Sequence, residues 1–235
     1  TRQLVMNTNK EQLSDIRVRQ ALHYGFNKEA MVEGVTSGLE EKADYILPPN
    51  FPYTSNVRAT TVNYDSEKAK QLLDEAGWKL PKGKDIREKD GQPLEIELMY
   101  NSAESIQKTM AETLQSEWAG IGVKLNIDGV ELTTQVERFK ANEFDMNFFS
   151  NYGAPYDPHT FVNIVATEGF GFRESISAYP NKAELLTQIA EVQQTVDENE
   201  RQNLYTEILG SLQEQGAIVP ISYIKQVAIY QKNVS

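Results

Sequence analysis

Leu94-Glu95-Ile96-Glu97-Leu98-Met99-Tyr100 is the stretch of sequence that decides the fold, because apolar and charged residues alternate along it as in a β-strand with one buried face. Residues 102–119 follow with the apolar spacing of an amphipathic helix, and residues 123–127 alternate again as a second strand. A helix over 133–141 and a third strand over 145–150 complete a β-α-β-α-β pattern. Crossovers of this kind are right-handed and join parallel strands, so the pattern predicts an α/β fold with a mixed, largely parallel sheet flanked by helices.

The residues before this section predict one strand and two main helices. Residues 3–7 resemble a strand, and the apolar positions of Leu13 to Phe26 indicate a helix that Ser14 can cap, with Asp15 and Arg19 placed for a surface ion pair. Residues 66–76 predict a second helix, and Gly77 stands where a left-handed C-terminal cap belongs.

The residues after it predict two more helices and a last strand. The expected apolar faces are Leu185, Ile189, Val192 and Val196 on the first helix, and Leu204, Ile208 and Leu212 on the second. Residues 218–230 indicate a strand or hairpin arm. The whole chain, 1–235, is therefore predicted to be a single α/β lobe.

Composition excludes several classes of protein. A length of 235 residues with 40% hydrophobic and 24% charged residues is typical of a globular domain with a proper core. The net charge of −11 argues against nucleic acid or an anionic membrane as the main partner. The chain has no cysteine, which removes disulfides, thiolate metal sites and cysteine nucleophiles. We find no phosphate loop, nucleophile elbow, dinucleotide fingerprint or zinc-protease motif, so an enzyme is not expected.

The stretch Asn151-Tyr152-Gly153-Ala154-Pro155-Tyr156-Asp157-Pro158-His159 is the main candidate site. Gly153 and Pro155 end the strand, and Asp157 followed by Pro158 is a typical helix start. Ligands of open α/β folds bind beyond the carboxyl ends of the strands, so this loop is expected to display Tyr152 and Tyr156 at such a position. The alternative is an ordinary strand-to-helix connection.

Four segments resemble the periplasmic nickel-binding proteins of nickel ABC importers, which belong to the dipeptide/oligopeptide-binding family of solute receptors. The stretch 151–159 is one, and Val219-Pro220-Ile221-Ser222-Tyr223-Ile224 also points to the nickel branch. The segments Arg17 to Lys28 and Tyr64 to Trp78 resemble motifs of the broader family. The resemblance spans nearly the whole chain and implies a lobe like those of type II periplasmic binding proteins. It identifies the chain as the C-terminal lobe of a longer, two-lobe protein whose first lobe is absent here.

The resemblance also implies a function. A receptor of this family is periplasmic, closes two lobes around a ligand, and delivers it to the permease of an ABC transporter. We expect a monomer with Tyr152 and Tyr156 as ligand contacts; the alternative is that both rings only fill the lobe interface. In the nickel-binding relative the first of these positions is an aromatic, often Trp, and a second His follows the motif, whereas residues 160–179 here contain none.

His159 is therefore a weak candidate metal ligand, and we favour a structural role for it. His23 is expected to be a surface or packing residue. Two histidines without thiolates hold bare Ni²⁺ poorly. We accordingly expect nickel to arrive as a small-molecule chelate, with no resident metal and no covalently bound cofactor. The main alternative is a dipeptide or oligopeptide receptor of the same family, and a peptide hydrolase is the least supported function.

Overall fold

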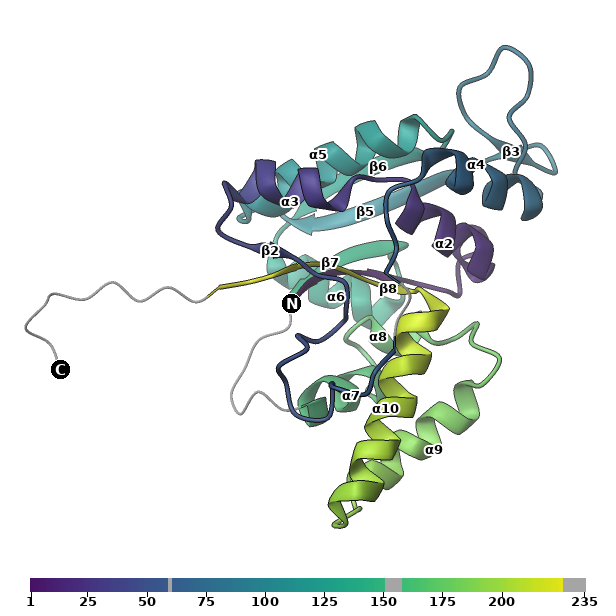
Figure 1. The fold of residues 1–235 in the computed structure, drawn as a ribbon. Helices are drawn as coiled ribbons and strands as arrows, with labels where there is room; N and C mark the ends of the chain where they lie inside the picture. Colours follow the sequence, from purple (N-terminus) through teal and green to yellow (C-terminus); the bar gives the residue numbers. More distant parts are fainter. Residues whose placement is uncertain (59–60, 151–157, 226–235) are drawn as a thin grey trace, which may run out of the picture.

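A six-stranded mixed sheet forms the centre of the molecule in the computed structural model, which describes residues 1–58, 61–150 and 158–225 (Figure 1). The strand order is β2-β8-β1-β7-β5-β6. The strands of this sheet are β1 (Arg2–Met6), β2 (Glu41–Lys42), β5 (Glu95–Asn101), β6 (Lys124–Val130), β7 (Met146–Ser150) and β8 (Ile218–Tyr223).

Ten helices surround the sheet within the described residues. In chain order these are α1 (Glu11–Ser14), α2 (Ile16–Tyr24), α3 (Lys28–Thr36), α4 (Ser66–Glu75), α5 (Ser105–Ala119), α6 (Leu132–Ala141), α7 (Pro158–Ala166), α8 (Phe172–Ser175), α9 (Lys182–Val192) and α10 (Glu198–Gln215).

A short hairpin of β3 (Glu88–Lys89) and β4 (Gln92–Pro93) stands apart from the sheet. Asp90 and Gly91 connect its strands with φ of 51° and 79°, the left-handed pair that a tight two-residue hairpin requires.

The predicted β-α-β-α-β unit is confirmed, and it makes up the parallel part of the sheet. β5 pairs in parallel with β6 from Glu95↔Lys124 to Asn101↔Val130, and with β7 at Leu98↔Met146 and Met99↔Asn147. β1 inserts between β7 and β8, and β2 adds to β8. These three pairings are antiparallel. The mixed α/β sheet is thus as expected, but its parallel part is limited to three strands.

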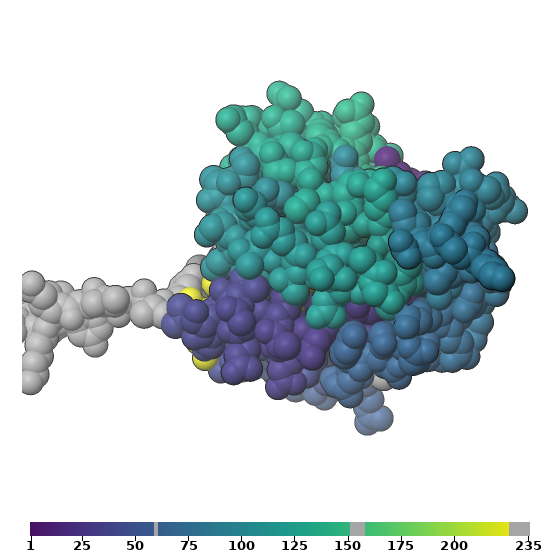
Figure 2. All heavy atoms as spheres, turned by 90° about the horizontal axis from the view of Figure 1, so that it is seen from above, coloured from purple at the N-terminus to yellow at the C-terminus, as the bar shows by residue number. Residues whose placement is uncertain are grey.

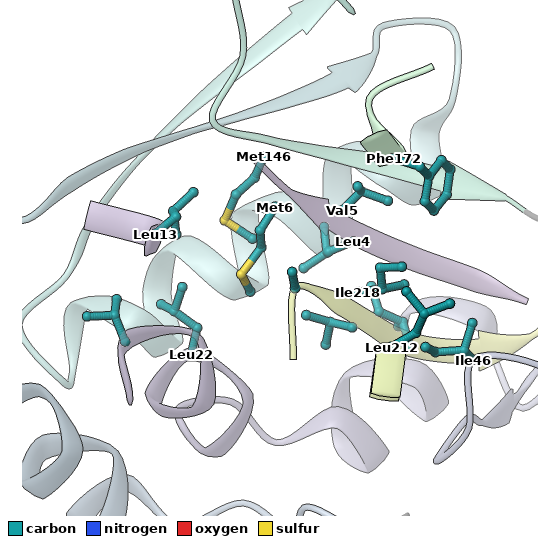
Figure 3. Packing of buried hydrophobic residues seen from close by; sticks show 14 of the residues in the cluster. Leu4, Val5, Met6, Leu13, Leu22, Ile46, Met146, Phe172, Leu212 and Ile218 are labelled. Carbon is teal, nitrogen blue, oxygen red and sulfur yellow. The ribbon is translucent and has the colours of Figure 1, made fainter. Parts of the chain in front are cut away.

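The hydrophobic core fills both faces of the sheet. Successive residues of a strand point to opposite faces, and Figure 3 shows this for β1: Leu4 and Met6 lie on the side of Leu22, whereas Val5 faces Phe172. Met6 is the register partner of Met146, so the two thioethers pack side by side. Each fully buried side chain of this size contributes about 1.5–3 kcal/mol. From above, the α3 segment lies against the α5 segment as an outer layer (Figure 2).

The first helical region differs from its prediction in a way that matters for stability. It divides into α1 and α2, and Asp15 rather than Ser14 caps α2 by accepting a hydrogen bond from the Arg17 backbone N–H. Arg17 is also the ion-pair partner of Asp15, at 2.6 Å between Nη2 and Oδ2. The predicted Asp15–Arg19 surface pair is wrong: Arg19 is only 1% exposed.

The remaining elements follow the predictions closely. The Asp65 side chain caps α4 by accepting from the Lys68 backbone N–H, and Gly77 has the expected left-handed φ of 91°. The prediction for Val196 is wrong, because α9 ends at Val192 and Val196 is 90% exposed. β8 ends at Tyr223, and residues 226–230 of the predicted strand or hairpin arm lie outside the described residues.

A buried polar cluster joins β1 and β8, the first and last strands in the sequence. Arg2 Nη2 lies 2.9 Å from Glu40 Oε1, and both side chains are less than 10% exposed. Ser222 of β8 donates its hydroxyl to the other oxygen of Glu40. Arg2 and Ser222 are also register partners, so β1 begins beside the end of β8.

Candidate functional site

The candidate site is a pocket of about 850 Å³ at the carboxyl ends of β5 and β7. In α/β sheets this is the edge at which ligands bind. Five segments line the pocket: the end of β5, the start of α5, the helix α6, the end of β7 and the turn 168–170. The predicted ligand contacts Tyr152 and Tyr156 lie outside the described residues and follow β7 directly in the sequence.

Helix α6 is held against the sheet by Arg138. Its Nη1 lies 2.8 Å from Asp128 Oδ2 on β6, and its Nη2 pairs with Glu97 on β5. Its Nε donates to the Glu143 backbone carbonyl at 2.7 Å. One guanidinium thus ties α6 to two strands, and the first turns of the helix face the pocket from a constrained position.

The burial pattern of α6 is inverted. Gln135 is the one buried residue of this helix, at 5% exposed, whereas Leu132 is 62% and Val136 38% exposed. A helix that served only the core would bury its apolar side chains and expose its polar ones. The apolar side chains of α6 line the pocket instead. Exposed apolar surface of this kind marks a binding surface.

Phe170 extends this apolar wall from the turn before α8. Its ring is 50% exposed, and it stands between Gly169 and Gly171, whose φ angles are 85° and 80°. Glycine adopts such left-handed φ angles without the steric cost that other residues incur. A side chain at Gly171 would meet Phe139, since its Cβ would lie 3.2 Å from Phe139 Cδ1. The sequence Gly-Phe-Gly therefore displays the ring while the turn packs closely on α6.

The buried side of the pocket is polar and uncharged. Gln107 is 8% exposed and its Oε1 accepts from the Asn101 backbone N–H at 3.0 Å. Gln135 Nε2 donates to Asn147 Oδ1 at 3.1 Å, and Asn147 Nδ2 donates to the Phe148 carbonyl. The charged residues that line the pocket, Glu104, Lys140 and Glu168, are all exposed at its rim.

The pKa of Glu174, on α8, differs from its usual value. Burial raises the pKa of Glu174 on α8, and the negative charge of Glu168 adds to that effect. Glu174 is half-buried, and its backbone carbonyl accepts hydrogen bonds from the Thr8 N–H and hydroxyl.

The two tyrosines predicted as ligand contacts, Tyr152 and Tyr156, lie outside the described residues. His159 is described: it is exposed in the first turn of α7, as expected, and it is not part of the pocket lining. His23 is a packing residue as expected, with Nε2 3.0 Å from the Gly216 carbonyl.

The structure also locates the two tryptophans of the chain. Trp78 and Trp118 are in the core, at 6% and 0% exposed. Residues 1–58, 61–150 and 158–225 contain no group of three or more His, Cys, Asp or Glu placed to hold a metal ion. Within those same ranges, no helix has the length and apolar character that a membrane crossing requires.

The sequence did not reveal that Leu132, Val136 and Phe139 of α6 line a pocket, nor that Gln107 and Gln135 are buried. The available signal was the spacing of Leu132, Val136 and Phe139, which is that of an ordinary core-facing stripe. Periodicity shows that a helix has an apolar face but not which way that face points. Only the position of α6 on the sheet shows that the stripe faces a pocket.

The chain is similar in sequence to two proteins of Escherichia coli. Over 226 residues the chain is 37% identical to the nickel-binding periplasmic protein of Escherichia coli strain K12, covering 96% of this chain and 43% of that protein. It is 32% identical to the dipeptide-binding protein of the same strain over 224 residues, covering 94% of this chain and 39% of that protein. The chain thus spans less than half the length of these relatives.

A solved structure shares the fold. The crystal structure of NikA from Brucella suis in complex with Fe(III)-EDTA superposes with a TM-score of 0.91 at 36% identity, covering 95% of this chain and 45% of that one. The family model that describes the middle region of the family 5 bacterial extracellular solute-binding proteins matches residues 1–171, which is well over half of the sequence. The chain therefore belongs to the family 5 bacterial extracellular solute-binding proteins.

Proposed function

We propose that this chain is the C-terminal lobe of a two-lobe periplasmic receptor that captures nickel as a small-molecule chelate and delivers it to the permease of an ABC importer. The carrying observation is the inverted helix α6, which presents exposed Leu132 and Val136 to a pocket at the carboxyl ends of the strands. The similarity to a nickel-binding periplasmic protein, and to a receptor crystallised with a metal chelate, supports nickel as the cargo.

The composition of the chain supports a complexed metal rather than a bare ion. The sequence has no cysteine and only two histidines, and Ni²⁺ prefers nitrogen and sulfur donors. The pocket instead offers an apolar wall and uncharged carboxamides. Such surfaces suit the organic part of a chelate, which brings its own metal ligands.

The mechanism we propose is closure without chemistry. This lobe supplies one wall of a cleft, and the second lobe of the full receptor supplies the other. Closure excludes water from the ligand, and the closed form is the state that the permease recognises. The length of the relatives, more than twice that of this chain, supports the two-lobe arrangement.

Calorimetric titration of the full two-lobe receptor tests the cargo. We expect no tight binding of Ni²⁺ alone and tight binding of Ni²⁺ with L-histidine. His159→Ala should leave the second titration unchanged, because His159 lies outside the pocket lining. Tight binding of the bare ion that is lost in His159→Ala would show that His159 is a metal ligand and that the chelate proposal is wrong.

The alternative cargo is a short peptide, favoured by the similarity to a dipeptide-binding protein. The two functions share the fold and the cleft and differ in ligand. Titration with L-alanyl-L-phenylalanine distinguishes them: tight binding of the dipeptide, with none of the nickel complex, would assign the receptor to peptides.

Tyr156→Ala in the full receptor should weaken binding of the Ni²⁺–histidine complex by about 1–3 kcal/mol, as for an aromatic contact in a closed cleft. The expected change in melting temperature is small, because the ring is proposed to contact the ligand and not to pack in the core. A loss of stability with unchanged affinity would make Tyr156 a packing residue, which is the alternative weighed from the sequence.

A further inference from the structure

The two buried glutamines of the pocket have their amide orientations set by the backbone. The Asn101 N–H can only donate, so the atom of Gln107 that meets it is the carbonyl oxygen, and Gln107 Nε2 is left over. The Phe148 carbonyl can only accept, so it takes Asn147 Nδ2. Asn147 Oδ1 then accepts from Gln135 Nε2, and Gln135 Oε1 is left over.

The two remaining atoms belong to side chains that line the pocket. No described residue forms a hydrogen bond with Gln107 Nε2 or with Gln135 Oε1. Neither atom is sealed inside the protein, although both side chains are more than nine-tenths buried and both line the pocket. The buried side of the pocket therefore presents one donor and one acceptor, each held by a side chain that the backbone orients.

A charged group does not fit this position. The carboxamides are neutral, and the charged lining residues stand exposed at the rim. A carboxylate or ammonium group placed against the glutamines would lose its hydration without a counter-charge. A carboxylate also has no proton for Gln135 Oε1, and an ammonium group has no lone pair for Gln107 Nε2.

We propose that Gln107 and Gln135 are specificity-determining residues that bind an uncharged amide group of the ligand. The amide carbonyl accepts from Gln107 Nε2, the amide N–H donates to Gln135 Oε1, and an apolar part of the ligand packs on Leu132, Val136 and Phe170. This rests on the proposed function for the use of the pocket, and it adds the chemical class that the pocket selects. An amide-bearing metal chelator and a short peptide both carry this group.

The test compares matched probes on the full receptor by calorimetry. Ni²⁺ is offered with L-histidinamide, which has an uncharged amide, and with L-histidine methyl ester, which keeps the carbonyl but lacks the N–H. The metal-free pair is L-alanyl-L-phenylalanine and the analogue with an ester in place of its peptide bond. In at least one pair the amide should bind about 10–100-fold more tightly than the ester, as expected when a buried acceptor is left unpaired.

Two variants locate that preference. Gln107→Glu keeps the oxygen that accepts from Asn101 but replaces the donor with a negative acceptor, and it should weaken the amide probe about 10–100-fold. Gln135→Met removes the acceptor and should bring the amide-to-ester ratio close to one. This ratio is measured within one protein sample, so it does not depend on the fraction that is folded. Gln194→Glu, which adds the same charge at an exposed position outside the pocket, should behave as wild type.

Each outcome separates this inference from the proposed function. Equal binding of amide and ester within both pairs, with the nickel complexes bound tightly, would overturn the amide inference and leave nickel capture standing. Amide selectivity in the metal-free pair only would support the inference and transfer the receptor to peptides. Selectivity that persists in both variants would overturn the assignment to Gln107 and Gln135. Absence of binding by every amide and ester probe would overturn the amide inference, and the titration with Ni²⁺ and L-histidine would still decide nickel capture.

Discussion

Arg19 shows how much one buried side chain can hold together. Its Nη1 donates to the carbonyls of Leu13 and Ser14, and its Nε donates to the carbonyl of Gln215, at 2.8 to 2.9 Å. These carbonyls are at the ends of α1 and α10, where helices have unpaired acceptors. The guanidinium also lies 5.8 Å from the centre of the Tyr179 ring.

Arg19→Met should lower the free energy of unfolding by about 2–4 kcal/mol, because it leaves three carbonyls without their donor. Urea denaturation of the chain measures this loss. Lys108→Met also replaces a cation with Met, but at an exposed position of α5, and should cost less than about 0.5 kcal/mol. Similar losses in the two variants would show that Arg19 contributes no more than a surface cation.

His23 should make stability depend on pH. Burial lowers the pKa of its imidazole to about 4, the charge of Lys28 adds to the decrease, and the hydrogen bond to Gly216 opposes it. The unfolded chain, with a pKa near 6.5, therefore binds a proton that the folded chain excludes between these two values. Stability should fall as the pH decreases from 6.5 towards 4, by at most about 3 kcal/mol.

His23→Gln can still donate to Gly216 but does not titrate, so the control is direct. Urea denaturation of both proteins at pH 7, 5 and 4 measures the difference, and the variant should lose less stability on acidification. Parallel curves for the two proteins would show that another group causes the acid sensitivity.

At the scale of single elements, two glycines in neighbouring helical segments have opposite roles. Gly34 lies inside α3, and a Cβ added there meets nothing within 4 Å. Gly25 ends α2, and a Cβ there would lie 2.6 Å from Ile121 Cδ1 and 3.0 Å from the Ala21 carbonyl oxygen. The close approach of α2 to the loop after α5 thus depends on Gly25.

Gly34→Ala should raise the melting temperature and stabilise the chain by about 0.5–1 kcal/mol, through lower entropy of the unfolded state. Gly25→Ala should destabilise it by about 1–3 kcal/mol through overpacking. Each Gly→Ala variant is the control for the other, and thermal melts of both proteins measure the difference in melting temperature. A stabilising Gly25→Ala would mean that Ile121 moves aside at little cost.

The elements were predictable where local chemistry decides them. Alternation identified β5 and β6, and the Gly77 cap follows from its residue type. The insertion of β1 between β7 and β8 was not predictable, because it joins segments far apart in the chain and periodicity carries no information on pairing partners. Arg19 was misplaced for the same reason, since its carbonyl partner Gln215 is distant in sequence.

The candidate site was predictable only in part. The resemblance of residues 151–159 pointed to the edge of the sheet where the pocket lies. It did not indicate Gln135, whose burial contradicts the usual preference of glutamine for the surface. Gln135 Nε2 is buried there with a partner, because it donates to Asn147 Oδ1 and Asn147 in turn donates to the Phe148 carbonyl of β7; that arrangement exists only in three dimensions.

For the molecule as a whole, the continuous core predicts independent folding. The core joins residues of nearly every element, from Leu4 on β1 to Ile221 on β8. We expect residues 1–235 to unfold in one cooperative transition followed by circular dichroism, and to be monomeric by light scattering. A broad transition with binding of a hydrophobic dye would show that the lobe needs its neighbour in order to fold.

The buried cluster of Arg2, Glu40 and Ser222 has a mechanical consequence. Because Arg2 and Ser222 are partners on adjacent antiparallel strands, β1 begins and β8 ends at the same end of the sheet. Tension applied at these two residues pulls the strands apart from that end, so the ladder between β1 and β8 is loaded one hydrogen bond at a time and not in shear. The Arg2–Glu40 ion pair lies at that end of the ladder, so it is the first contact to bear the load.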